Sequence, residues 1–235
     1  MGMEGFAWGV LFGAFIGNFA LQIIGVKKLK LRYSPIINLS HPDLFKYFKL
    51  TLPLMLGLTM TFSMEILIKF FGSFLEIGRI SAMNYAIRIM FILVGLFGQA
   101  IGMASYPFMA KLAGEGKLME LNRLLNNTLK FIFLVIPFSV LFIVLNHEIV
   151  LLLFQRGRFD AQATMITANI LPFFMVGAFA FAAQTLIARG YYAVQNTLFP
   201  SIFSSVCVLL SLPLIYGLMI IKGAAGLALG LSVSA

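Results

Sequence analysis

Long apolar stretches separated by short polar and basic segments run through the whole chain. A helix needs roughly 20 mostly apolar residues to cross a bilayer. By this measure the pattern predicts complete membrane-spanning helices at residues 5–26, 50–75, 80–112, 124–145, 164–187 and 198–221, with a seventh starting at Ala224. The predicted fold class is therefore all-α, a polytopic transmembrane helix bundle.

Basic residues are distributed unevenly among the connections between these spans. The first, third and fifth connections carry eleven lysines and arginines, whereas the second, fourth and sixth carry four. Cytoplasmic loops of membrane proteins show such an excess, so the odd-numbered connections are predicted to be cytoplasmic. The N-terminus is then expected outside, as in a piece of a longer protein that begins after an odd number of spans.

The first connection has a helix signal of its own. Residues 40–43 (Ser-His-Pro-Asp) are typical of a helix start, with a capping serine and a proline in the first turn. Residues 44–49 then alternate aromatic side chains with lysines, as helices at a membrane surface do. We expect a short amphipathic helix on the inner leaflet.

Composition agrees with a membrane protein and excludes several other classes. The chain is 61% hydrophobic and 11% charged, against about 45–50% and about 25% in soluble domains. The net charge of +9 is explained by basic residues that set topology and contact anionic lipid head groups, so membrane lipids rather than nucleic acid are the expected partners. No metal-binding cluster, cofactor motif or catalytic motif is present in the sequence, and an enzyme is not expected.

Small residues and prolines mark helix contacts and bends. Glycines recur every four residues in three spans, a pattern that lets helix backbones approach closely. They are Gly5, Gly9, Gly13 and Gly17 in the first span, Gly98 and Gly102 in the third, and Gly226 and Gly230 in the seventh. Ordinary packing and a sliding surface between moving helices both fit this pattern. Pro172 lies inside the fifth span and favours a kink there.

Ionisable residues at membrane depth are costly, and they are functional candidates for that reason. Glu65 and Lys69 lie four apart in the second span, where they share a helix face and can pair. Arg88 lies in the third span without an acid near it on its own helix. Its guanidinium suits phosphate oxygens, although Glu65 is a competing partner that would make Arg88 structural. Asn84 and Gln99 are further possible polar groups of a cavity.

Three motifs resemble a known family. They are GLFGQAIG at residues 95–102, LFQRGRF at 153–159 and YYAVQNT at 191–197. Their order and spacing are similar to those of the MurJ (MviN) lipid II flippases of the MOP transporter superfamily. Arg88 matches the arginine of the family's Tyr-Ala-Asp-Arg motif, whereas Ile87 replaces the acid before it.

The resemblance implies a MOP-type half of a flippase that moves lipid II, an undecaprenyl-diphosphate-linked peptidoglycan precursor, across the bacterial inner membrane by alternating access. Residues 1–26 would then be the final span of an N-terminal lobe, 27–49 a cytoplasmic linker and 50–235 a truncated C-terminal lobe. The rest of the N-terminal lobe would be a partner missing from this chain. Arg88, Lys69 and Glu65 would bind substrate in the cavity.

Two alternatives remain open from the sequence. One is a transporter of the same superfamily that moves another polyprenyl-linked glycan or a drug. The other is a non-transporting membrane scaffold, which predicts a dry, packed interior in which Arg88 pairs with Glu65 and Lys69.

Overall fold

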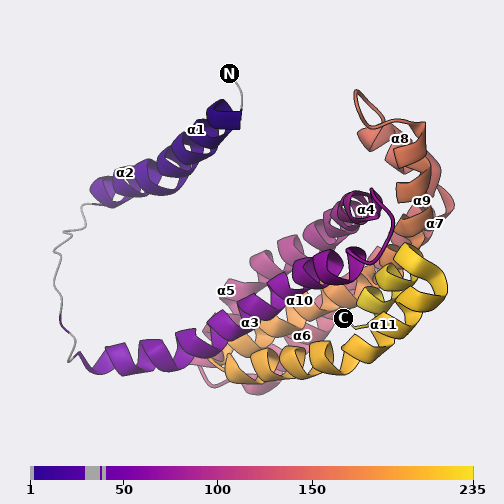
Figure 1. Cartoon of the computed structure of the whole chain (residues 1–235). Helices are drawn as coiled ribbons and strands as arrows, with labels where there is room; N and C mark the ends of the chain where they lie inside the picture. The colour runs from indigo at the N-terminus through magenta and orange to yellow at the C-terminus, as the bar shows by residue number, and fades with distance from the viewer. Residues whose placement is uncertain (1–2, 30–37, 39–40, 235) are drawn as a thin grey trace. The chain divides into compact units, whose positions relative to one another are not determined.

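The computed structural model describes residues 3–29, 38 and 41–234 of the chain. The chain divides into two compact units, Met1–Leu44 and Phe45–Ala235. Each regular element in the described residues is a helix (Figure 1). These are α1 (Met3–Ala14), η1 (Phe15–Ala20), α2 (Leu21–Lys28), α3 (Pro42–Gly72), α4 (Arg79–Leu93), η2 (Val94–Gln99), α5 (Ala100–Gly114), α6 (Leu118–Ile132), α7 (Val135–Val144), α8 (Asn146–Phe154), α9 (Ala161–Met175), α10 (Ala178–Ala193) and α11 (Leu198–Val233).

The first unit contains one apolar helix. It runs continuously through α1, the π-helical turn η1 and α2, and the part from Glu4 to Lys28 has 25 residues with a mean hydropathy of 1.8. At about 1.5 Å per residue this length is sufficient to cross a bilayer. The helix corresponds to the predicted span at residues 5–26.

Further spans lie in the second unit. The helices Arg79–Gly114, Leu118–Val144 and Leu198–Val233 are long and apolar enough to cross a membrane. A fourth crossing is formed by α9 and α10 together, which meet at an angle of 50°. The bend follows Pro172, whose ring nitrogen cannot donate to the preceding turn, so the predicted kink is present.

The helix α3 covers the predicted second span but begins earlier, at Pro42. Residues 44–49 form its first turns, whereas a separate interfacial helix was expected. No glycine or proline occurs in residues 44–52 to end a helix there, which explains the continuity. The backbone N–H of Asp43 donates to Nδ1 of His41 (3.2 Å), and Ser40, the expected cap, lies outside the described residues.

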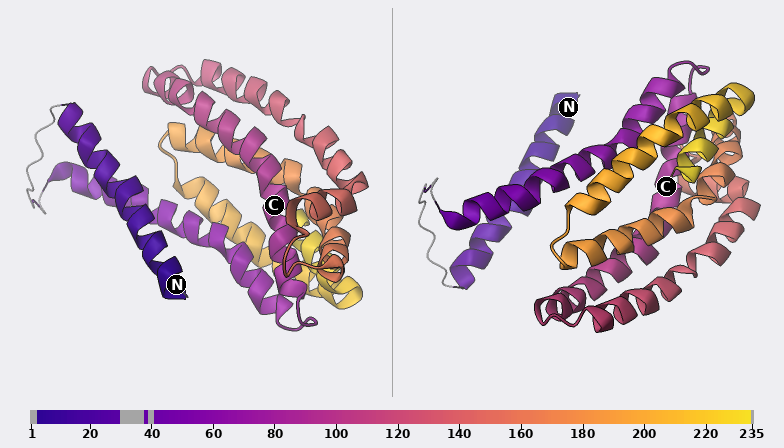
Figure 2. Two further views of the ribbon diagram at one scale, coloured as in Figure 1. Left: turned by 90° about the horizontal axis from the view of Figure 1, so that it is seen from above. Right: turned by 90° about the horizontal axis from the view of Figure 1, so that it is seen from below.

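The predicted sixth and seventh spans are the two legs of α11, which reverses direction at Gly223 (Figure 2). Gly223 has φ 58° and ψ −133°, a conformation that glycine adopts without steric cost. The legs then pack closely, because a Cβ added to Gly230 would lie 2.9 Å from the Cα of Ile215. This contact fits the predicted role of the small residues in helix packing.

The core of the second unit lies where α4 crosses α9, with α10 and α11 packed around them. Met83, Met90, Leu171 and Phe174 are fully buried there. On the other side of the core, η2 approaches α10 so closely that a Cβ added to Gly98 would lie 2.9 Å from the Cα of Ala182. Glycine at this position is therefore required by the distance between the two helices.

The connections of the second unit gather at two ends, as the predicted alternation of loops requires. At the end that we call the basic end, the hydroxyl of Thr197 donates to the carbonyl of Leu50 (3.0 Å), which joins the start of α11 to α3. At the opposite end, the pocket end, residues 74–79 line pockets together with the α8–α9 connection and with Gly223. The excess of basic residues predicts that the basic end faces the cytoplasm.

Candidate functional site

The helix α4 has two contrasting faces. Met83, Ala86 and Met90 are fully buried against neighbouring helices, mainly α9. Arg88 lies on the other face and is exposed. It forms no hydrogen bond or ion pair with any residue that the structure describes. The local sequence explains its direction, because the apolar residues of α4 recur on the face that packs against α9.

Glu65 and Lys69 lie near the end of α3 and pair with each other, with 4.0 Å between Nζ and Oε2. Their side chains are 68% and 69% exposed. Pairs of this kind contribute little to stability. In the described part of the chain neither side chain is joined to Arg88, so the structure does not bring the three charged residues into one network.

The two predicted polar residues flank Arg88 along the same continuous helix. Asn84 precedes Arg88 by about one helical turn and is half-buried, and Gln99 ends the π-helix η2 with an exposed side chain. The carbonyl oxygen of Gln99 accepts a hydrogen bond from Nη1 of Arg189 (2.7 Å).

Arg189 is a structural residue that the sequence did not single out. Its guanidinium joins α10 to the end of η2 and lies against Gly102. A larger residue at position 102 would occupy the space of this guanidinium. No signal in the sequence links Arg189 to Gln99, because the two residues are ninety positions apart.

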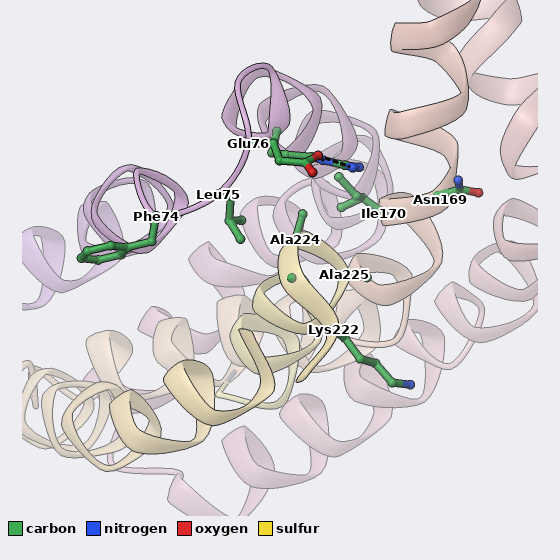
Figure 3. Close-up of a pocket in the computed structure, with 10 residues that line it drawn as sticks. Phe74, Leu75, Glu76, Asn169, Ile170, Lys222, Ala224 and Ala225 are labelled. Atoms are coloured by element: carbon green, nitrogen blue, oxygen red, sulfur yellow. Dashed lines mark hydrogen bonds and ion pairs between the residues drawn. The ribbon is translucent and has the colours of Figure 1, made fainter. Parts of the chain in front are cut away.

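A pocket of 330 Å³ opens at the pocket end between the α3–α4 connection, α9 and the reversal of α11. Glu76 accepts a hydrogen bond from Nη2 of Arg79 (2.8 Å) at its edge, and Lys222 extends away from Glu76 (Figure 3). Two of the three charged side chains that line this pocket, those of Glu76 and Arg79, are thus paired with each other. A second pocket, of 450 Å³, lies between α4 and the start of α9.

No metal site is formed by the residues that the structure describes. Among them, no group of three or more histidine, cysteine, aspartate or glutamate side chains comes together.

Several apolar helices long enough to cross a bilayer define an integral membrane protein, and the exposed arginine within one of them is a candidate functional residue. The profile of the family described as lipid II flippase MurJ matches residues 1–235. The chain belongs to this family, and the resemblance seen in its motifs is confirmed.

Individual relatives agree with the family match. The chain is 28% identical over 226 residues to a probable lipid II flippase MurJ of Rhizobium meliloti, covering 94% of this chain and 41% of that protein. It is 29% identical over 228 residues to the corresponding protein of Helicobacter pylori strain J99, covering 97% and 48%. The chain thus spans less than half the length of these curated relatives.

A solved structure described as lipid II flippase MurJ in an inward closed conformation has the same fold. The TM-score is 0.71 at 25% sequence identity, over 91% of this chain and 45% of that chain. The predicted all-α membrane bundle is confirmed. With its family and its apolar helices, the chain is a multi-pass protein of the bacterial inner membrane.

Proposed function

We propose that this chain supplies one lobe of a transporter that moves lipid II across the inner membrane, and that its role is transport rather than catalysis. The relatives are named probable lipid II flippases. They are about twice as long as the part that this chain matches. An alternating-access cavity lies between two repeats or lobes, so the proposed cycle needs a second lobe facing this one.

One observation carries the proposal. Arg88 is exposed on a membrane-spanning helix and no described residue neutralises it. A bare guanidinium at membrane depth is costly unless it faces a cavity or a counter-charge. A diphosphate offers several oxygens to the five donors of a guanidinium, and the lipid-linked substrate of a lipid II flippase carries one.

Lys69 and Glu65 have a secondary role in this proposal. Their ion pair is long at 4.0 Å and exposed, so the ammonium of Lys69 remains able to attract a diphosphate. Binding would offset the positive charge of the cavity, and the two lobes would then close around the head group while the lipid tail stays in the bilayer. Asn84, about one turn from Arg88, would add a neutral hydrogen-bonding group beside it, and Gln99 would add one roughly 16 Å farther along the same helix.

The scaffold alternative is not favoured by these observations. It predicted that Arg88 pairs with Glu65 and Lys69 in a dry interior. In the residues described, Glu65 and Lys69 pair only with each other and Arg88 is exposed. The relatives and the solved structure described above all carry the name lipid II flippase MurJ, which supports lipid II over a different lipid-linked glycan or a drug as the substrate.

The test is the substitution Arg88→Ala in the full-length gene product, measured by complementation of a strain depleted of its own lipid II flippase. We expect loss of growth, and partial rescue by Arg88→Lys, which keeps the charge but not the planar fork of donors. Arg79→Ala is the matched control, because Arg79 lies on the same helix and is already paired with Glu76. Full complementation by Arg88→Ala at normal protein levels would refute the assignment.

A further inference from the structure

The second pocket at the pocket end is lined by residues other than Arg88, and the proposed function gives it no role. It has a volume of 450 Å³, within the range of about 300–1,000 Å³ that small-molecule sites occupy. Its lining comes from the start of α4, the α8–α9 connection and the first turns of α9. We call it the α4–α9 pocket.

The α4–α9 pocket lies in line with Arg88. Ser81 and Tyr85 line the pocket from α4, and they precede Arg88 by seven and three residues, which places all three on one helix face. With a rise of about 1.5 Å per residue, Tyr85 is roughly 4.5 Å and Ser81 roughly 10 Å from Arg88 along the helix axis. A group attached to a diphosphate at Arg88 would therefore reach the mouth of the pocket.

The pocket has an aromatic side. The ring of Tyr85 lies 4.8 Å from that of Phe154 and 4.9 Å, edge to face, from that of Phe159. Tyr85 and Phe159 both line the pocket. Such a cluster fixes the ring of Tyr85 in place and offers a rigid amphipathic surface next to the polar groups.

The remaining lining mixes apolar residues, among them Ile77, Ala82 and Ile166, with polar side chains that are largely uncommitted. Ser81, Gln162 and Arg158 are exposed, and Arg158 forms no ion pair with any residue described. Thr167 lines the pocket too, and its buried hydroxyl has no hydrogen-bond partner in the described part of the chain. Asp160 caps α9, because its Oδ1 accepts a hydrogen bond from the backbone N–H of Ala163 (2.8 Å), and its carboxylate places a negative charge in the lining beside Arg158.

We propose that the α4–α9 pocket binds the polar head group of the substrate, a saccharide, while Arg88 holds the diphosphate. This inference rests on the proposed function. An aromatic surface beside neutral and charged hydrogen-bonding side chains suits a sugar, which offers both apolar ring faces and hydroxyl groups. The head group then lies farther toward the pocket end than the diphosphate, so it leads the diphosphate across the membrane.

The experiment compares two ligands on the purified full-length gene product in detergent. One is lipid II, and the other is undecaprenyl diphosphate, which has the same anchor and diphosphate but no head group. Dissociation constants are measured for Arg158→Ala and Gln162→Ala, with Arg156→Ala as the matched control. Arg156 lies two positions from Arg158 in the same connection and is not among the residues that line the pocket.

We expect Arg158→Ala to weaken lipid II binding by about tenfold or more and Gln162→Ala by about fivefold, in keeping with the loss of a charged and a neutral hydrogen bond. Binding of undecaprenyl diphosphate should not change in either variant, and Arg156→Ala should behave like the wild type. Equal weakening of both ligands, or no weakening of either, would overturn the inference.

A failure of the proposed function can be distinguished from a failure of this inference by a further variant. Arg88→Ala should weaken both ligands, because both carry the diphosphate. If Arg88→Ala changes neither, or if the wild type binds neither, the diphosphate site is wrong and the head-group site falls with it. Since the side chains of Arg158 and Gln162 are exposed, neither substitution should prevent folding, and the melting temperature in the same detergent checks this.

Discussion

The two ends of the second unit are held together in different ways. At the basic end, side chains bond to backbone groups far away in the sequence, as Arg189 does to Gln99 and Thr197 to Leu50. At the pocket end, the charged contact between Glu76 and Arg79 joins residues three apart, and two pockets separate the helices. A distant bond, from the hydroxyl of Ser232 to the carbonyl of Phe173 (2.7 Å), occurs only deeper in the lobe among the bonds described for this half. Distant bonds fix helices relative to one another, whereas local ones do not. The basic end of this lobe should therefore move as one body.

The largest effect is expected where η2 meets α10. In Gly98→Ala the added Cβ would lie 2.9 Å from the Cα of Ala182, and backbone cannot move aside cheaply. We expect a loss of about 1–3 kcal/mol of stability, measured by thermal unfolding in detergent. Gly95→Ala is the matched control on the same π-helix, since no atom lies within 4 Å of its added Cβ, and it should leave stability unchanged or raise it by up to about 1 kcal/mol. Similar melting temperatures for the two variants would contradict the close contact.

A smaller effect is expected from a pair of arginine substitutions that compares the two ends directly. Arg189→Ala removes the donor to the carbonyl of Gln99 and should cost about 1–3 kcal/mol of stability. Arg79→Ala breaks an ion pair whose glutamate is 80% exposed, and should cost no more than about 1 kcal/mol. Unfolding of both variants in one detergent gives the comparison. A larger loss of stability in Arg79→Ala than in Arg189→Ala would show that the pocket end, and not the basic end, is the more firmly held.

The smallest effect concerns pH at the basic end. A hydrogen bond from Lys117, and then its charge, hold the pKa of the Glu115 carboxyl below its ordinary value of 4.5. The same pair raises the pKa of Lys117. A lowered folded-state pKa contributes stability above the unfolded-state value, and this is lost as pH falls through the folded-state value.

The melting temperature of Glu115→Gln should therefore lie slightly below that of the wild type at pH 7. The difference should shrink as the pH falls below 4.5. Glu148→Gln serves as the control, since Glu148 forms no ion pair in the part of the chain described, and its difference from the wild type should not vary in the same way. A Glu115→Gln difference that stays constant from pH 7 to acid would argue against the ion pair in solution.

Most of the fold could be predicted from the sequence, because apolar length and basic connections impose strong constraints in a bilayer. The spans, the kink after Pro172 and the close packing at Gly98 and Gly230 all follow from single residues or short windows. The join between α3 and the expected interfacial segment could not be predicted, because residues 44–52 suit a surface helix and a longer helix equally well.

Less of the candidate site than of the fold could be predicted from the sequence. The exposure of Arg88 follows from the cost of burying an unpaired charge, although its role as a ligand stays a prediction. The bond between Arg189 and Gln99 and the lining of the α4–α9 pocket depend on helices distant in the sequence. Local patterns carry no information about which distant helices meet, so Arg158 and Gln162 could not be assigned to a common pocket.

The π-helix η2 determines where Arg88 points. A π-helical turn contains one residue more than an α-helical turn, and each residue of an α-helix turns the chain by about 100°. If residues 94–99 were wound as ordinary α-helix with none removed, the surplus residue would rotate all of α4 about its axis by roughly that angle relative to α5. Arg88 would then point away from its present side of the helix, so the wide turn preserves the phase between the anchored half of the span and the half that carries Arg88.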